Sequence, residues 1–168
     1  MIGKCKAIAH GSTALDYIFR EGKLRKHLVS NHIYGTTPKE IYGEMKMVSD
    51  YNTRCRNKFL RIEIGIAPKD EKRLSLESVR NLASNFARQI GLKNHQWVAV
   101  THKDTDNMHI HIIANRISLY EEVYDTTFVS NKAARVAEDL SRKYGLTIAK
   151  EVRVEKAYQK AKANPTRE

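Results

Sequence analysis

Three histidines, His102, His109 and His111, lie within a stretch of ten residues. Side chains alternate across a β-strand, so His109 and His111 project from the same face of a strand that contains both. A turn between His102 and His109 brings the third imidazole to the same point. Neutral imidazoles are common ligands of divalent metals, and three protein ligands leave positions open for substrate oxygens. The spacing therefore predicts a catalytic metal site made of histidines.

The alternative interpretations of these histidines are structural. A single histidine in a strand is usually half-buried with a satisfied hydrogen bond, and His-x-His alone is a weak indication of metal binding. No packing or capping requirement explains three imidazoles on the polar face of one hairpin. The only cysteines, Cys5 and Cys55, are not nearby, which disfavours a structural zinc site with thiolate ligands.

A β-hairpin is the predicted support for the histidines. Residues 96–102 (QWVAVTH) and 108–117 (MHIHIIANRI) are apolar, β-branched runs, and residues 103–107 between them are polar. In the second run Ile110 and Ile112 face away from the histidines. One face of the hairpin is thus expected to be polar and functional, and the other to belong to the core.

A further strand is predicted over residues 59–67 (FLRIEIGIA), with its isoleucines on one face and Arg61 and Glu63 on the other. A carboxylate in such a strand is most often a salt-bridged surface residue. If this strand neighbours the histidine strand, Glu63 is placed to orient a metal-binding imidazole or to accept a proton.

Helices and one more strand complete the expected domain. We predict a strand over residues 2–9, a short helix from Ser12 or Thr13 to about Gly22, and a helix over residues 39–48. Two strongly periodic helices are expected from Ser75 to Gly91 and from Ser130 to Gly145, each serine serving as N-cap. This order predicts an α+β fold with an open, largely antiparallel sheet, helices packed on one face and the metal site on the other.

The composition indicates a basic protein with a polyanionic partner. The 168 residues suit one domain, and 30 Lys and Arg against 19 Asp and Glu give a formal net charge of +11. Nucleic acid is favoured over a membrane because no lipidation or amphipathic signal is present, although a basic soluble protein with solvated charges has the same composition. Two distant cysteines and no signal-peptide core predict a reducing cytoplasm, and no apolar run reaches membrane-spanning length.

Several basic residues are candidates for contacts with nucleic acid. Tyr51 is followed by alternating cations, a composition that suits a stacked base and phosphates but also a solvated connector. Asn115 is directed toward the histidine face, whereas Arg116 is expected on the opposite face. The candidate contacts are Lys23, Arg25, Arg54, Arg56, Arg61 and Asn115. Residues 150–168 are rich in Lys, Ala and Glu and are expected to form a basic helical extension or a disordered tail after a domain of residues 1–149.

The histidine stretch resembles a motif of a known family. His102-x-Asp104 followed by His109-x-His111 and then Asn115-Arg116 is similar to the third motif of relaxase/mobilization nucleases, members of the His-hydrophobic-His endonucleases. The segment DYIFREGK, residues 16–23, resembles their first motif, in which the tyrosine is the nucleophile. Residues 131–146 resemble the helix that follows the third motif. The resemblance covers nearly the whole chain and implies the same α+β architecture.

On this resemblance Tyr17 is the nucleophile, and the tyrosines held in reserve are Tyr34, Tyr42, Tyr51, Tyr120 and Tyr124. The family implies nicking of single-stranded DNA at a transfer origin in conjugative mobilization, with Mg²⁺ or Mn²⁺ on the three histidines and a 5′-phosphotyrosine product. Glu63 would have the supporting role of an acidic residue on the corresponding strand. Asp104 is expected to orient His102, or merely to shape the turn. Accessory mobilization proteins and a coupling protein are implied as partners.

Two other functions compete with this interpretation. A metal-dependent rolling-circle replication initiator with the same histidine pair would also nick DNA, but the segment around Tyr17 disfavours it. A basic nucleic-acid-binding module whose histidines hold a structural metal would make no cuts.

Overall fold

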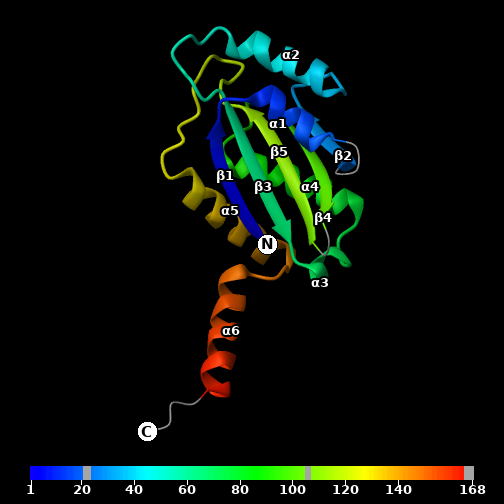
Figure 1. The fold of residues 1–168 in the computed structure, drawn as a ribbon, viewed down its shortest axis with the longest axis vertical. Coiled ribbons are helices and arrows are strands. Elements are labelled where there is room, and N and C mark those ends of the chain that lie inside the picture. Colours follow the sequence, from blue (N-terminus) through cyan, green and yellow to red (C-terminus); the bar gives the residue numbers. More distant parts are fainter. Residues whose placement is uncertain (21–23, 105–106, 165–168) are drawn as a thin grey trace.

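In the part of the chain that the structure describes, five antiparallel strands form one sheet, accompanied by six helices (Figure 1). The structure is a computed structural model that describes residues 1–20, 24–104 and 107–164, and of Lys103 and Asp104 it describes the backbone alone. The strands are β1 (Ile2–Ile8), β2 (Leu24–Asn31), β3 (Phe59–Ile66), β4 (Trp97–Asp104) and β5 (Asn107–Asn115). The helices are α1 (Gly11–Ile18), α2 (Pro38–Ser49), α3 (Pro68–Glu71), α4 (Leu76–Ile90), α5 (Val129–Tyr144) and α6 (Ala149–Ala163).

The predicted hairpin of β4 and β5 lies at the centre of the sheet. The strand order is β1-β3-β5-β4-β2, and all four pairings are antiparallel. His102 lies opposite His109, while His111 lies between Val100 of β4 and Glu63 of β3. The α+β fold with an open antiparallel sheet is therefore confirmed, and β3 is the neighbour of the histidine strand.

Helices α4 and α5 cover the apolar face of the sheet, as predicted from their periodicity (Figure 1). Their buried side chains, Phe86 and Leu140 among them, pack on Ile62 and Ile112. The N-cap Ser75 accepts a hydrogen bond from the Ser78 amide at 3.1 Å, and Gly91 ends α4 with φ of 102°, a backbone conformation that favours glycine.

The histidine face is not wholly polar, which corrects the prediction that helices lie on one face only. Helices α1 and α2 cover its far end and form a second apolar cluster, in which Leu15, Ile18 and Met45 pack with Val100 and other buried residues. The apolar residues of this face lie on β3, β4 and β5: Phe59, Val98, Val100 and Ile113. These strands are therefore apolar on both faces at one end, and the covering helix α1 carries Tyr17.

Strand β2 was not predicted. No strand was expected between residues 22 and 39, but β2 pairs with β4 at the edge of the sheet. Register shifts between Leu24 and Lys26 and between His27 and Val29 interrupt the alternation that marks a strand. The bulges explain why the pattern is hard to recognise in the sequence.

Two predicted helix caps are wrong. Helix α1 begins after His10 without a side-chain cap, so neither Ser12 nor Thr13 has that role. Helix α5 begins at Val129 after Phe128, whose φ is 54°, and the Ser130 hydroxyl instead donates a hydrogen bond to the Cys5 carbonyl oxygen at 3.2 Å. Ser130 therefore ties α5 to β1.

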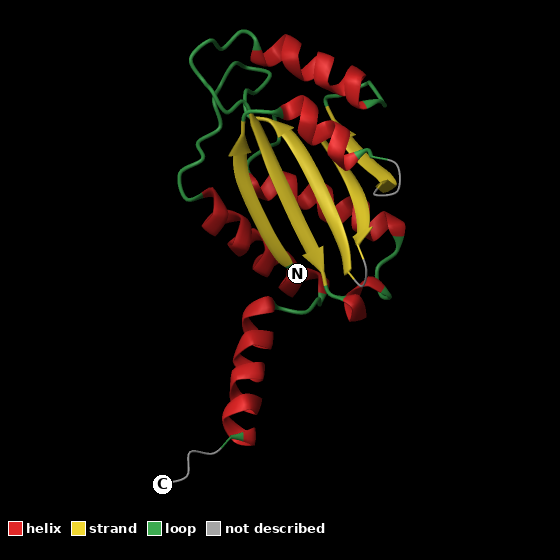
Figure 2. Cartoon of the chain, viewed as in Figure 1, coloured by secondary structure: helices red, strands yellow, loops and turns green. Residues whose placement is uncertain are grey.

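The last helix, α6, projects from the body of the domain (Figure 2). None of its residues is buried. Across the described ranges no helix is both long and apolar enough to cross a membrane.

Candidate active site

The hairpin register brings the three histidines together. The ring centroids of His102 and His111 are 4.3 Å apart, and those of His109 and His111 are 6.2 Å apart. His102 is 0% exposed and His111 4% exposed, whereas the side chain of His109 is 25% exposed. One imidazole of the cluster thus faces solvent, and the other two lie beneath α1.

Tyr17 is the tyrosine that reaches this cluster. Its ring centroid lies 5.9 Å from that of His102 and 6.4 Å from that of His111, in edge-on contacts. Tyr17 projects from α1 on the side next to the apolar stripe of Ala14 and Ile18, and it is half-buried. Among the described tyrosines no other ring contacts His102, His109 or His111.

The alternative candidate tyrosines lie away from the histidine cluster. Tyr34, Tyr51 and Tyr120 are 71% exposed or more, and Tyr42 packs on Phe59. The Tyr124 hydroxyl donates a hydrogen bond to the Ile90 carbonyl oxygen, and burial raises the pKa of Tyr124 to about 12. A phenol held protonated inside the core is a poor nucleophile, so Tyr124 does not compete with Tyr17.

Two residues of β3 flank the phenol and the exposed imidazole. Oε1 of Glu63 lies 3.4 Å from Nδ1 of His109, without the geometry of a hydrogen bond. The guanidinium carbon of Arg61 lies 5.3 Å from the centroid of the Tyr17 ring, in a cation–π contact. The alternation predicted for β3 is correct, because both side chains share the face of the histidines.

The buried ring nitrogens suit a divalent metal. Nδ1 of His102 and Nδ1 of His109 are buried and have no hydrogen-bond partner among the described residues. Imidazole nitrogens with a free lone pair are good ligands for such ions. In the part of the chain that the structure describes, however, no three His, Cys, Asp or Glu side chains are already arranged as a complete ligand set.

A family model described as "Relaxase: MobA/VirD2-like, nuclease domain" matches residues 17–146. The chain belongs to this relaxase family. It is 34% identical to Protein TraI of Escherichia coli over 71 residues and 42% identical to Protein MobA of Acidithiobacillus ferrooxidans over 43 residues. These segments cover 42% and 26% of the chain but only 10% of each relative.

The fold of this relaxase domain is similar to that of a solved structure, the MobM relaxase domain bound to a 26-nucleotide oriT DNA. The TM-score is 0.56 and the sequence identity 17%, and the match covers 88% of this chain and 90% of that one. At this low identity the likeness establishes the shared architecture.

Asn115 is not a surface residue of the relaxase domain, contrary to prediction. It is 0% exposed, and its amide nitrogen donates to the Met45 carbonyl oxygen at 2.9 Å and to Oε1 of Gln96 at 3.0 Å. Strand alternation does place Asn115 on the histidine face, but α2 covers that end. Its burial contradicts the predicted contact with DNA and indicates a structural role.

The other predicted DNA contacts are scattered around the domain. Arg54 and Arg56 are exposed in the segment that leads into Phe59, which lies opposite Asn115 at the end of β3 remote from His109. Arg25 is exposed on the edge strand β2, next to Leu24, which lies opposite His102. Lys23 and the side chain of Asp104 lie outside the described residues, so their predicted roles stay predictions.

Two lysines of this relaxase domain, Lys4 and Lys6, are not among the predicted DNA contacts. Lys4 lies opposite Glu63 and Lys6 opposite Arg61, and both are exposed. The alternation of residues 2–9 already separates these lysines from the buried Cys5, so the sequence pattern does place both lysines on one face of the strand. Together with Arg61 they extend the basic surface from the histidines to the β1 edge.

Proposed function

We propose that this domain is a DNA relaxase that nicks single-stranded DNA at a transfer origin, with Tyr17 as the nucleophile. The observation that carries the proposal is the packing of the Tyr17 ring against His102 and His111. Family membership and the basic surface support it, and the MobM domain of similar fold is described as bound to oriT DNA. The +11 net charge suits a phosphodiester substrate.

In the proposed reaction the Tyr17 hydroxyl oxygen attacks the phosphorus of the scissile phosphodiester. A bond forms between that oxygen and phosphorus, and the bond between phosphorus and the 3′ oxygen breaks. The phenol loses its proton, and the departing 3′ oxygen gains one. The products are a 5′-phosphotyrosine and a free 3′-hydroxyl. Because one phosphodiester replaces another, the step is nearly neutral in energy and reversible, which suits later rejoining of the strand.

We further propose that His102, His109 and His111 hold Mg²⁺ or Mn²⁺. When bound, this cation supplies positive charge that stabilises the extra negative charge of the phosphoryl transition state. Neutral imidazoles leave that charge undiminished, whereas carboxylate ligands would partly cancel it. Glu63 beside His109 is placed to orient that imidazole.

Arg61 has a positioning role in this proposal. Its guanidinium lies over the phenol ring and limits the orientations that Tyr17 adopts. It also places positive charge over a phenol that becomes negative as the proton leaves. In the wider process the domain would act in the cytoplasm with accessory mobilization proteins and a coupling protein.

The test is a covalent-adduct assay with single-stranded oligonucleotides that span a candidate transfer origin, in the presence of Mn²⁺. The wild-type chain is expected to form a protein–DNA band that survives denaturation, and mass spectrometry should locate the adduct on Tyr17. Tyr17→Phe should abolish the band, whereas the exposed Tyr120→Phe should leave it unchanged. An undiminished adduct in Tyr17→Phe would refute the assignment, and DNA binding without any adduct would favour a non-catalytic binding module.

A further inference from the structure

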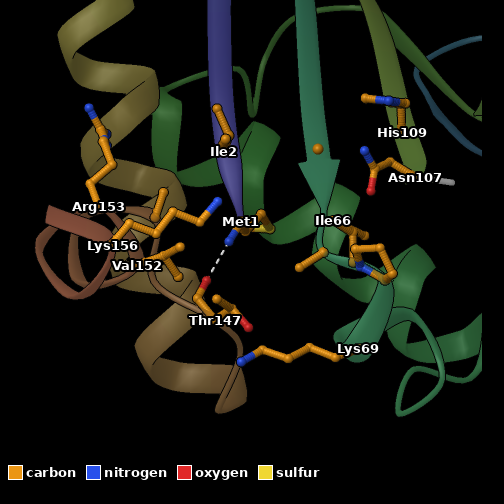
Figure 3. Close-up of a pocket in the computed structure, with 14 residues that line it drawn as sticks. Met1, Ile2, Ile66, Lys69, Asn107, His109, Thr147, Val152, Arg153 and Lys156 are labelled. Carbon is orange, nitrogen blue, oxygen red and sulfur yellow. Dashed lines mark hydrogen bonds between the residues drawn. The ribbon is translucent and has the colours of Figure 1, made fainter. Parts of the chain in front are cut away.

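A cavity with a volume of about 700 Å³ lies where the start of β1 and the end of β3 meet α6. Figure 3 shows Val152, Arg153 and Lys156 of α6 on one side of it and Ile66, Asn107 and His109 on the other. We refer to this cavity as the α6 groove. Its volume falls within the range of roughly 300–1,000 Å³ that is usual for ligand sites.

Two kinds of side chain line the α6 groove. The walls include the aliphatic Ile2, Ile66 and Val152, and the cations are Lys69, Arg153 and Lys156. The described residues that line the groove include no Asp or Glu side chain. Apolar walls with cations alongside suit a nucleotide, because its base has apolar faces and its phosphates are anionic.

His109 connects the α6 groove to the candidate active site. It lines the groove, and its ring centroid is 6.2 Å from that of His111. Gly65, which lies opposite His109 on β3, also lines the groove. A strand whose phosphate lies at the histidines therefore has a neighbouring nucleotide within reach of the groove.

We propose that the α6 groove receives the base of a nucleotide adjacent to the scissile phosphate, with Lys69, Arg153 and Lys156 contacting the phosphates around it. This inference rests on the proposed function, since it takes single-stranded DNA as the ligand. It assigns a binding role to α6, a helix with no buried residue and no part in the histidine cluster. The base would lie between Val152 and the aliphatic side chains of β1 and β3.

The test measures binding without cleavage. We compare the Kd for oligo(dT) with that for a deoxyribose-phosphate strand of equal length that lacks bases, at one salt concentration. The wild-type chain should prefer oligo(dT). Val152→Glu puts a carboxylate into the groove and should lower the ratio of the Kd for the strand without bases to the Kd for oligo(dT) about fivefold. Val154→Glu makes the same change two residues away, at a side chain that is 65% exposed and outside the groove, and should keep the wild-type ratio.

A second pair of variants tests the phosphate contacts. Lys156→Ala should weaken binding of both strands and reduce the slope of log Kd against log salt by about 0.7, the value for one phosphate contact on a single strand. Lys160→Ala, one helical turn farther along and outside the groove, should change neither quantity.

Three results would overturn the proposal. They are an equal wild-type affinity for the two strands, an unchanged ratio in Val152→Glu, or the same loss in both valine variants. If the groove instead binds an apolar protein segment, Val152→Glu would leave the ratio of the two Kd values unchanged, which is the second of these results. Because no adduct is measured, the α6 groove is tested separately from Tyr17. Base-dependent binding can persist when Tyr17 forms no adduct, and Tyr17 can form an adduct when binding does not depend on the bases.

Discussion

Nε2 of His102 lies 2.6 Å from the carbonyl oxygen of Ile18, the last residue of α1. A carbonyl oxygen only accepts hydrogen bonds, so Nε2 is the donor, and Nδ1 of the neutral ring keeps its lone pair. The bond satisfies one of the carbonyl groups that a helix end leaves without an intrahelical partner. Since Ile18 directly follows Tyr17, the same imidazole that is a candidate metal ligand also holds the phenol in place.

This double role distinguishes His102 from His109. His102→Ala should lower the free energy of unfolding by about 1–3 kcal/mol, because it leaves the Ile18 carbonyl oxygen buried without its donor. His109→Ala should cost less, since the His109 side chain is 25% exposed and makes no hydrogen bond to a described residue. Urea unfolding of both variants measures the difference, and both should lose adduct formation. Equal stability losses would contradict the structural role of His102.

Arg61 should affect adduct formation through Tyr17. Arg61→Met removes the cation over the phenol ring, and the single-turnover rate of adduct formation should fall about two- to thirtyfold, the equivalent of roughly 0.5–2 kcal/mol for a cation–π contact. Arg61→Lys keeps the charge and should recover part of the rate. The exposed Arg135→Met, on α5, is the matched control for loss of one positive charge. Should Arg135→Met slow the reaction equally, the effect of Arg61 would be general electrostatics.

Strand alternation predicted the centre of the candidate site from the sequence, because the spacing of residues in a regular strand determines which side chains share a face. It placed Glu63 and Arg61 with the histidines, and His102 opposite His109. Alternation says nothing about what covers a face. Val98, Val100 and Ile113 share the histidine face, and their apolar character was a sign of the second helical layer that the prediction missed. For the same reason Asn115 was correctly oriented but wrongly expected to be exposed.

Long-range packing explains the remaining differences. Strand β2 forms by pairing with β4, about 70 residues later in the chain, and its bulges hide the period of two. Ser130 has the chemistry of an N-cap, but Phe128 takes the positive φ at the helix start and the hydroxyl reaches β1. Such choices depend on tertiary contacts that no local pattern contains.

Stability should depend on pH through His95. Burial lowers the pKa of His95, an effect only partly opposed by the hydrogen bond between Nδ1 and the Asn115 carbonyl oxygen and by the nearby Glu122 carboxylate. The unfolded state therefore binds the proton more readily than the folded state. The contribution of His95 to the free energy of unfolding is fully present above the ordinary histidine pKa of about 6.5. It is lost as the pH falls through the lowered pKa of the folded state.

His95→Gln should flatten this dependence, as measured by urea unfolding between about pH 5 and about pH 8. Burial also lowers the pKa of His27, so part of the loss at low pH should remain in the variant. His10→Gln is the control, because His10 is exposed. A stability profile in His95→Gln that matches the wild type would show that His95 does not govern the change.

Metal binding by the histidine cluster should be visible as stability, independently of any cleavage. A ligand that binds only the folded state at about 100 times its Kd adds about 2.7 kcal/mol to the free energy of unfolding, so Mn²⁺ should raise the Tm of the wild-type chain and EDTA should reverse the shift. The double variant His109→Ala, His111→Ala should lose the shift, whereas the exposed His10→Ala should retain it. The buried Nδ1 atoms of His102 and His109 are the structural reason to expect an ion there. If Mn²⁺ stabilised the double variant as much as the wild type, the ion would bind elsewhere, and the histidines would need another role.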